Sequence, residues 1–475
     1  MPADLTLRNT DVSPARFSPG FLFAINFRSP TAARSQIQRL LLLGYGTSAA
    51  TYPLNQPVLV TGKTDYDTKF GRGSDLAREI AAAVDEVGSG AIPIYGCRIA
   101  EPSGGVASAY QIIVAGTATA AGYVEVFVVG VGPAVVNIAN GDTASTIASA
   151  LKTQLDGLLD APLTWGVASA TVTGTYRVKG VHGEDLPIRV NQYGAAGITF
   201  SPGSLTFASA AVGAGSVQVK SGAIAATASL AGGEAASAIA TAVNTAINGG
   251  ATPVPFTSAV NGVDNTKVDL FYAPDRDLRR VTAKVITSTG TTINGVAAGS
   301  TASIGTSGSN SPGSGTPSLT AAMTAISALD EFQVWAHCFA DTTSLGTIAT
   351  NVATLTDGSN GEALHSFACA TSDLTTAGGL PSGSSPALTG SSRHTVAWAV
   401  DAGQQGYEIA ARLAAAMVAD SYQAKNWDGY RFRSRSVAPF FATAPASRPA
   451  FADIESAGNT YALQPITVDS FGRYT

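Results

Sequence analysis

The sequence predicts an α/β core, a mixed sheet with flanking helices, that is split by an insert of two small repeated α+β domains. It also predicts extended N- and C-terminal strand arms. Three observations lead to this fold class. Buried strand and helix patterns occur before residue 105 and return after residue 318. A block within the intervening region repeats at an offset of 92 residues. A strand-like stretch lies near each end of the chain. At 475 residues the chain is long enough for two to four domains of about 150 residues each.

The N-terminal arm, residues 1–29, has large apolar residues at every second position: Phe21, Phe23, Ile25 and Phe27. This spacing predicts a half-buried strand. The C-terminal arm, residues 458–475, has a shorter alternating stretch with Ile466 and Val468. Each stretch has loops on both sides and no hairpin partner next to it, so its backbone groups need a partner elsewhere. We expect both arms to pair as strands with other subunits.

The core is expected in two pieces, residues 30–105 and 318–457. Continuous apolar runs predict buried strands, which lie at 39–44, 57–60, 91–99, 334–339, 365–369 and 395–400. Helical periodicity predicts helices at 75–87, 345–355 and 407–422, the first of them capped by Ser74 and ended by Gly88. Since strands and helices alternate, the core strands should be mainly parallel and share one sheet.

The region between the two pieces is expected to hold two related domains, residues 106–193 and 194–286. Gly141–Thr153 and Gly233–Thr245 are identical at seven of thirteen positions. A strand precedes each copy and two β-like runs follow it, so the unit reads β–α–β–β. Pro162–Trp165 then aligns with Pro253–Phe256 after a one-residue gap. Residues 287–317 carry no charged side chain and are rich in Gly, Ser and Thr, which predicts a linker.

Composition indicates assembly and gives no general reason for nucleic-acid binding. Charged residues make up 13% of the chain, about half the usual ~25%, and the net charge is −5. We expect no signal peptide and no membrane span. Cys97, Cys338 and Cys369 are odd in number and lack metal-ligand spacing, which predicts buried thiols, with Cys338 and Cys369 on neighbouring strands. An intersubunit disulfide is the alternative, chiefly for Cys97 if it is exposed.

The sequence contains partial matches to nucleotide-binding motifs, but the residues around them do not allow the structure that such a site requires. Gly44–Ala49 matches G-x-G-x-x-A, but Pro53 and Pro57 leave no room for the helix that must follow. Gly62-Lys63-Thr64 resembles a P-loop, except that Pro57 stands where its first Gly is needed. The four histidines lie in no metal or catalytic motif. The basic stripe of Arg431, Arg433 and Arg435 fits a salt-bridge surface, a solvated strand face or, less simply, a nucleic-acid contact. We therefore predict no catalytic, cofactor or metal residues, no cofactor and no enzymatic activity.

Taken in order, several blocks resemble the contractile tail sheath protein of Mu-like bacteriophages. These blocks are Pro19-Gly20 with the arm strand, Gln38–Gly44, Phe70–Ala77 and Val334–Phe339. The resemblance covers residues 15–105 and 318–475. It implies stacked hexameric rings around a tail tube, joined by strand exchange between arms, and contraction that drives the tube through the host envelope during genome delivery.

The same resemblance implies the partners and the location. Partners would be other copies of the chain, the tail tube protein, and baseplate and tail terminator proteins, with no direct nucleic-acid contact and no membrane insertion. The location would be the virion tail, after assembly in the host cytoplasm. A related phage-derived contractile particle is equally compatible with these blocks. The alternatives are another self-assembling surface or structural protein, or a cytosolic α/β enzyme.

Overall fold

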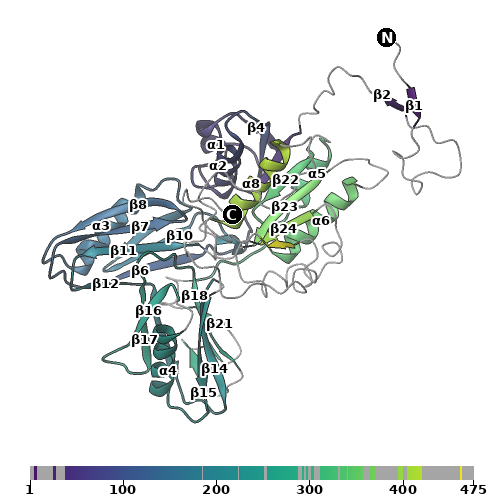
Figure 1. Cartoon of the computed structure of the whole chain (residues 1–475). Helices are drawn as coiled ribbons and strands as arrows, with labels where there is room; N and C mark the ends of the chain where they lie inside the picture. The colour runs from purple at the N-terminus through teal and green to yellow at the C-terminus, as the bar shows by residue number, and fades with distance from the viewer. Residues whose placement is uncertain are drawn as a thin grey trace.

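A computed structural model describes most of the chain between residues 38 and 419. The described ranges are 5–7, 25–27, 38–183, 186–222, 224–250, 254–286, 291–293, 296–297, 301–303, 311–329, 332–339, 341–356, 364–370, 394–398, 404–419 and 460–462. Segments from both halves of the sequence, purple and green in Figure 1, form the core together. Two β-rich units, blue and teal, extend from it.

The core is a mixed sheet of seven described strands in the order β25-β24-β23-β22-β3-β5-β4. Their bounds are β3 Leu40–Tyr45, β4 Pro57–Val60, β5 Ile94–Ile99, β22 Val334–His337, β23 His365–Ala370, β24 His394–Trp398 and β25 Thr460–Ala462. All neighbours are parallel except β4, which runs antiparallel to β5. Leu40 of β3 lies opposite Val334 of β22, so the predicted sharing of one sheet by both halves of the core is confirmed.

The leucine run of β3 explains why this sheet lies at the centre of the protein. Leu40 and Leu42 pack into one hydrophobic cluster with helices α1 (Lys63–Phe70), α2 (Asp75–Val87) and α8 (Gly406–Ala419). Leu41 and Leu43 pack into another with α5 (Thr320–Ser327) and α6 (Thr342–Thr356). Because successive side chains of a strand point to opposite faces, a continuous apolar run requires cover on both. Helices on the two faces provide it.

Helix α2 begins and ends where the sequence predicts. The Ser74 hydroxyl accepts a hydrogen bond from the Ala77 N–H at 3.1 Å, which caps the first turn. Gly88 follows the last residue with φ +93°, a conformation that L-residues with a side chain rarely adopt. The helix is therefore fixed at both ends, and its first turn holds the polar residues described below.

The first β-rich unit follows β5. It comprises β6 (Ala109–Gly116), β7 (Gly122–Val128), β8 (Val131–Ile138), α3 (Ala144–Asp156), β9 (Leu163–Ala168), β10 (Thr171–Tyr176), β11 (Ile188–Gly194) and β12 (Ile198–Ser201). The second comprises β13 (Gly203–Ala208), β14 (Gly215–Ser221), β15 (Ile224–Leu230), α4 (Ala236–Gly249), β16 (Phe256–Val260), β17 (Lys267–Tyr272) and β18 (Val281–Ile286), with the short strands β19 (Thr292–Ile293), β20 (Val296–Ala297) and β21 (Thr301–Ser303).

The two units have the same strand pairing. In the first, β10 lies between β9 and β6, and β7 lies between β8 and β11. In the second, β17 lies between β16 and β13, and β14 lies between β15 and β18. The helices bury the same four positions at the 92-residue offset: Ile147, Ala148, Leu151 and Leu155 in α3, and Ile239, Ala240, Val243 and Ile247 in α4.

Two expectations for this region differ from the structure. The first unit has three strands before its helix and four after it, and the second has at least three on each side, more than β–α–β–β, because strands such as Ala- and Thr-rich β15 lack a clear apolar alternation. The strand alignment also shifts. Leu163 pairs with Tyr176 where Phe256 pairs with Tyr272, so Leu163, rather than Trp165, corresponds to Phe256.

Part of the stretch expected as a linker, residues 287–317, forms strands. β19 pairs with β13, and β21 pairs with the outer edge of β18. Farther on, Ser314 forms an antiparallel bridge with Val106, the residue at which the chain leaves the core. The segments that lead into and out of the β-rich units therefore lie side by side. The low charge of the segment gave no sign of these pairings, which join residues far apart in sequence.

Candidate functional site

The predicted arm strands are described only in part. β2 (Ile25–Phe27) pairs antiparallel with β1 (Leu5–Leu7), and the two form a separate sheet. The sequence predicts that this strand pairs elsewhere than with a neighbouring hairpin, and Leu5–Leu7, which was not predicted as a strand, is a partner within the same chain. Phe21 and Phe23 lie outside the described residues.

At the other end of the chain, Thr460–Ala462 forms β25 beside β24, in the core sheet of the same chain. The predicted C-terminal strand residues Ile466 and Val468 lie outside the described residues, as does the basic stripe at Arg431, Arg433 and Arg435.

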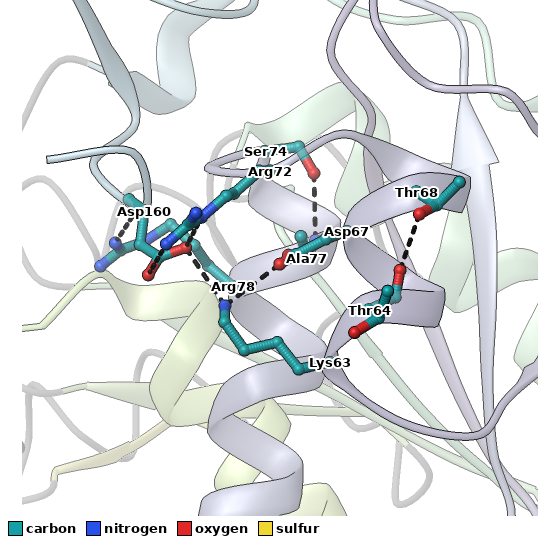
Figure 2. A network of polar contacts seen from close by, with 9 residues as sticks. All are labelled: Lys63, Thr64, Asp67, Thr68, Arg72, Ser74, Ala77, Arg78 and Asp160. Atoms are coloured by element: carbon teal, nitrogen blue, oxygen red, sulfur yellow. Dashed lines mark hydrogen bonds and ion pairs between the residues drawn. The ribbon is translucent and has the colours of Figure 1, made fainter. Parts of the chain in front are cut away.

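The most elaborate polar site among the described residues lies where α2, the start of α8 and the first β-rich unit meet. We call it the three-way junction, and define it by Asp75, Arg78, Asp160, Tyr176, Tyr407 and Glu408. Sequence reasoning missed it, since these residues come from four separate segments. Figure 2 shows its outer part, in which Lys63, Arg72 and Arg78 gather around Asp160.

Asp160 lies in the loop that follows α3 and binds the helical segment of the core. Its carboxylate accepts hydrogen bonds from Arg72 Nε at 2.7 Å and Arg72 Nη2 at 3.0 Å. Lys63 Nζ adds a contact at 3.2 Å. The paired hydrogen bonds from Arg72, and then the contact with Lys63, lower the pKa of Asp160 to about 2.

The backbone reinforces this contact at Gly73, between α1 and α2. A Cβ atom at Gly73 would lie 2.7 Å from the Ala161 carbonyl oxygen and 2.9 Å from that of Leu159. The residue also has φ +75°. Only Gly allows both this conformation and so close an approach. The loop between the helices and the loop after α3 therefore fit directly against each other.

Arg78 is the central cation of the junction and is 7% exposed. Its Nη2 lies 2.7 Å from Oε1 of Glu408, which is equally buried. Its Nη1 donates to the Asp160 carbonyl oxygen at 2.8 Å, and Nη2 also donates to that of Val129 at 3.3 Å. One guanidinium thus joins α2, α8 and two loops of the first β-rich unit. Its planar fork of donors suits several acceptors at once.

A second contact joins the same three elements one helical turn away. The Tyr176 hydroxyl, from the end of β10, donates a short hydrogen bond to Asp75 Oδ1 on α2. It also lies 3.4 Å from the Tyr407 hydroxyl on α8. Asp75 and Arg78 are three residues apart and share one face of α2. Both rows of contacts are buried, so the junction is part of the protein interior.

Glu79, also on α2, is fully buried beside the junction. Neither of its carboxylate oxygens has a hydrogen-bond partner among the described residues. Burial raises the pKa of Glu79 well above its usual value, and the nearby carboxylates of Asp75 and Glu408 add to the effect. The side chain is therefore held in its neutral form at pH values where an exposed Glu is ionised.

We expect Glu79→Gln to make folding stability less dependent on pH. A carboxyl whose pKa is raised in the folded state contributes stability that is present at low pH and is lost as pH rises toward the folded pKa, by up to about 1.4 kcal/mol per pH unit. Between pH 5 and 8, the free energy of unfolding of the variant should therefore rise relative to that of the wild type, as measured by urea titrations. Asp85→Asn removes an exposed carboxylate of the same helix that pairs with Arg412 at 3.5 Å, and it controls for the loss of a negative charge on α2. If the free energies of unfolding of Glu79→Gln and the wild type depend on pH in the same way, Glu79 is not neutral in the folded protein.

Asp160→Asn should weaken only the outer part of the junction. Because Asp160 is 40% exposed, solvent screens its ion pairs, and we expect a loss of about 0.5–1 kcal/mol. Its lowered pKa implies that the wild type loses this contribution as pH falls from about 4 toward 2, since protonation then removes the carboxylate charge. Thermal melts at pH 7 measure the effect. The matched control is Asp156→Asn, which breaks an exposed pair with Lys152 within α3 and should cost a few tenths of a kcal/mol.

The two cysteines with described side chains are buried thiols. Cys97 is inaccessible on β5, and burial raises its pKa to about 12. Its proposed role in an intersubunit disulfide required exposure, so that alternative is removed. Cys338 follows β22 and is also buried. β22 and β23 are neighbours, as predicted for Cys338 and Cys369, although the side chain of Cys369 lies outside the described part.

Neither a metal-ligand cluster nor a membrane-spanning helix occurs among the described residues. Within them, no group of three or more His, Cys, Asp and Glu side chains is placed to hold a metal ion. Similarly, no helix in the described ranges is both long and apolar enough to cross a bilayer. His337 is buried, and its Nδ1 lies 3.1 Å from the Phe339 carbonyl oxygen, which is the structural role expected for it.

Comparison with known proteins identifies a relative of the kind that the sequence blocks indicated. No family model matches the chain. A stretch of 168 residues is 26% identical to the Mu-like prophage FluMu tail sheath protein of Haemophilus influenzae. The match covers 35% of this chain and 34% of that protein, so it spans about a third of each. This part of the chain is thus similar to a tail sheath protein.

Solved structures of sheath tail proteins give weaker similarities. One from Desulfitobacterium hafniense is 12% identical with a TM-score of 0.27, and the alignment covers 83% of this chain and 62% of that one. One from Listeria innocua is 8% identical with a TM-score of 0.28 and coverage of 93% and 68%. These scores are low, so the relationship rests on the sequence match.

Proposed function

We propose that the chain is the structural subunit of a contractile tail sheath. It polymerises as stacked hexameric rings around a tail tube and contracts to drive that tube through the host envelope during genome delivery. The observation that carries this proposal is the 168-residue match to a Mu-like prophage tail sheath protein. A polymer of this kind stores energy in its lattice, so neither a cofactor nor a nucleotide is needed.

The domain organisation that fits this role is a discontinuous sheath core, residues 30–105 with 318–457, carrying two repeated domains predicted at 106–193 and 194–286, with β12 of the second range on the sheet of the first domain. Support comes from the matched strand pairing of the two β-rich units and from the bridge between Val106 and Ser314. Both features are expected when a duplicated segment is inserted at one point of an older domain. In the sheath these domains would face outward.

The arms would link subunits through Phe21, Phe23, Ile25, Phe27, Ile466 and Val468. Support comes from β1 and β2, which make a two-stranded sheet without hydrogen bonds to the core sheet. An isolated two-stranded hairpin is marginally stable in water. Pairing with a neighbouring subunit would add the strands and apolar cover that it lacks.

The remaining partners are those of a sheath. They comprise the tail tube protein inside the rings and baseplate and tail terminator proteins at the two ends. No direct contact with nucleic acid and no membrane insertion are needed. The location would be the virion tail, after assembly in the host cytoplasm.

Electron microscopy of the purified protein tests this function. We expect tubular polymers of uniform diameter with six-fold symmetry in cross-section, and a shorter, wider form after contraction. Coexpression with the tube protein from the same source should fill the lumen of these tubes. A protein that stays monomeric with its tube partner present, across salt and pH, would contradict the sheath assignment.

A further inference from the structure

The three-way junction has a property beyond joining two parts of the chain. Arg78 contacts both the first β-rich unit and Glu408 of α8, and Asp75 accepts a hydrogen bond from Tyr176, whose hydroxyl lies 3.4 Å from that of Tyr407 on α8. The two α8 residues, Tyr407 and Glu408, are adjacent and belong to its first turn. Any displacement of that turn therefore acts on both rows of contacts.

The first turn of α8 is itself held firmly. The Glu408 carboxylate accepts a hydrogen bond from the Gln405 N–H at 3.0 Å while its other oxygen binds Arg78. This is the half of a capping box in which the acidic side chain satisfies the N–H of the residue before the helix. A shift of Glu408 would break the cap and the ion pair together. The side chain is thus coupled to the start of α8 as well as to α2.

We propose that Arg78 is a mechanical tie through which α2, α8 and the first β-rich unit move as one body. The assignment is independent of the sheath function and concerns how displacement passes through the subunit. One guanidinium holds acceptors from residues 129, 160 and 408, and the hydroxyl pair of Tyr176 and Tyr407 repeats the connection. A force on α8 is transmitted to the first β-rich unit through buried, charge-assisted hydrogen bonds.

The tie predicts an effect at a distance that a local contact does not produce. Glu408 accepts from Arg78, as do the Val129 and Asp160 carbonyl oxygens, so the two loops are linked to Glu408 through the Arg78 guanidinium. Removing the Glu408 charge frees Arg78 from α8, so its hydrogen bonds to the two loops lose their fixed anchor. A purely local ion pair would affect α2 and α8 only.

Hydrogen exchange on the full chain tests the tie. In Glu408→Gln we expect protection to fall about tenfold at the start of α8 and also in the loops around Val129 and Asp160. Arg78→Lys should give the same pattern, because the three donors of an ammonium lie on a single nitrogen and cannot reach acceptors that are placed around a planar guanidinium. The matched control is Arg72→Lys, which alters an exposed arginine on Asp160 and should affect the Asp160 loop while leaving α8 unchanged.

Loss of protection in Glu408→Gln that is confined to α8 and α2 would overturn the proposal. So would additive effects of Arg78→Lys and Tyr407→Phe, since residues of one body should lose protection together and the second change should then add little. If Arg78→Lys does not fold, Glu408→Gln and Tyr407→Phe still decide the outcome, because both keep the cation in place.

Discussion

Removal of residues 1–28 is expected to leave a folded monomer that no longer polymerises into tubes. The deletion takes away β1 and β2, which form their own sheet, and no hydrogen bond of the core sheet is lost. Each intersubunit backbone hydrogen bond contributes only about 1 kcal/mol, but four or five bonds from every arm make a continuous mesh. Unchanged circular dichroism with no tubes by negative-stain microscopy is the expected result.

Two further variants sharpen this test. Deletion of residues 1–4, ahead of β1, should leave tubes intact and controls for shortening of the chain. Deletion of residues 463–475 removes Ile466 and Val468 but keeps β25 at the edge of the core sheet. It therefore tests the contribution of the predicted C-terminal strand to polymerisation separately from that of the core. Tubes of normal length from the 1–28 deletion would refute strand exchange by the N-terminal arm.

The core could be predicted because its signals are local. The apolar runs of β3, β5 and β22 are buried on both faces. Such a run predicts a buried strand from its own residues, however long the insert between the runs is. The bounds of α2 followed from Ser74 and Gly88. The duplication was visible because α3 and α4 keep the same apolar positions, whereas strands rich in Ala and Thr did not stand out.

The three-way junction could not be predicted, because it has no local signal. Asp75, Arg78 and Glu79 on a helix look like an ordinary solvated face, and Asp160 looks like a loop residue. Only the fold brings Asp160 and Glu408 to the same guanidinium. The one hint was the spacing of three charged residues at i, i+3 and i+4 in a helix that is otherwise apolar on most sides. The partners of these charged residues lie up to hundreds of residues away in the sequence, and only the folded structure determines which of them come into contact.

Deletion of the second β-rich unit should be tolerated far better than deletion of both units. The second unit has a hydrophobic cluster of its own, including Leu205, Val217 and Ile239. The cluster of the first unit is continuous with the core, since Ile112 and Val124 belong with Leu41 and Tyr45. Tyr272 packs against both clusters, and the deletion also removes the backbone bridge between Ile188 and Leu278, so part of the first unit is uncovered while its own cluster stays intact.

The deletion points can be chosen from the structure. The Pro202 carbonyl oxygen accepts from Gln111 Nε2 at 3.0 Å, and that of Ser311 accepts from the Ala109 N–H at 2.9 Å. Both cut ends therefore lie near one end of β6, on the order of 10 Å apart. A short Gly–Ser linker can replace residues 203–310. We expect a soluble protein with a melting temperature within a few degrees of the wild type, and tubes that still form.

Replacing residues 107–313 instead closes the chain where Val106 and Ser314 already exchange two hydrogen bonds of 2.9 Å. The backbone geometry is as favourable, yet this variant uncovers part of the shared cluster and the buried charges of Arg78 and Glu408. Each large apolar side chain returned to water costs about 1.5–3 kcal/mol, so a few of them approach the whole stability of a domain, about 5–15 kcal/mol. We expect aggregation or a melting temperature lowered by more than ten degrees, on the order of what such a loss implies. Equal stability of the two deletions would show that the first unit is no part of the core, and would contradict both the shared cluster and the tie at Arg78.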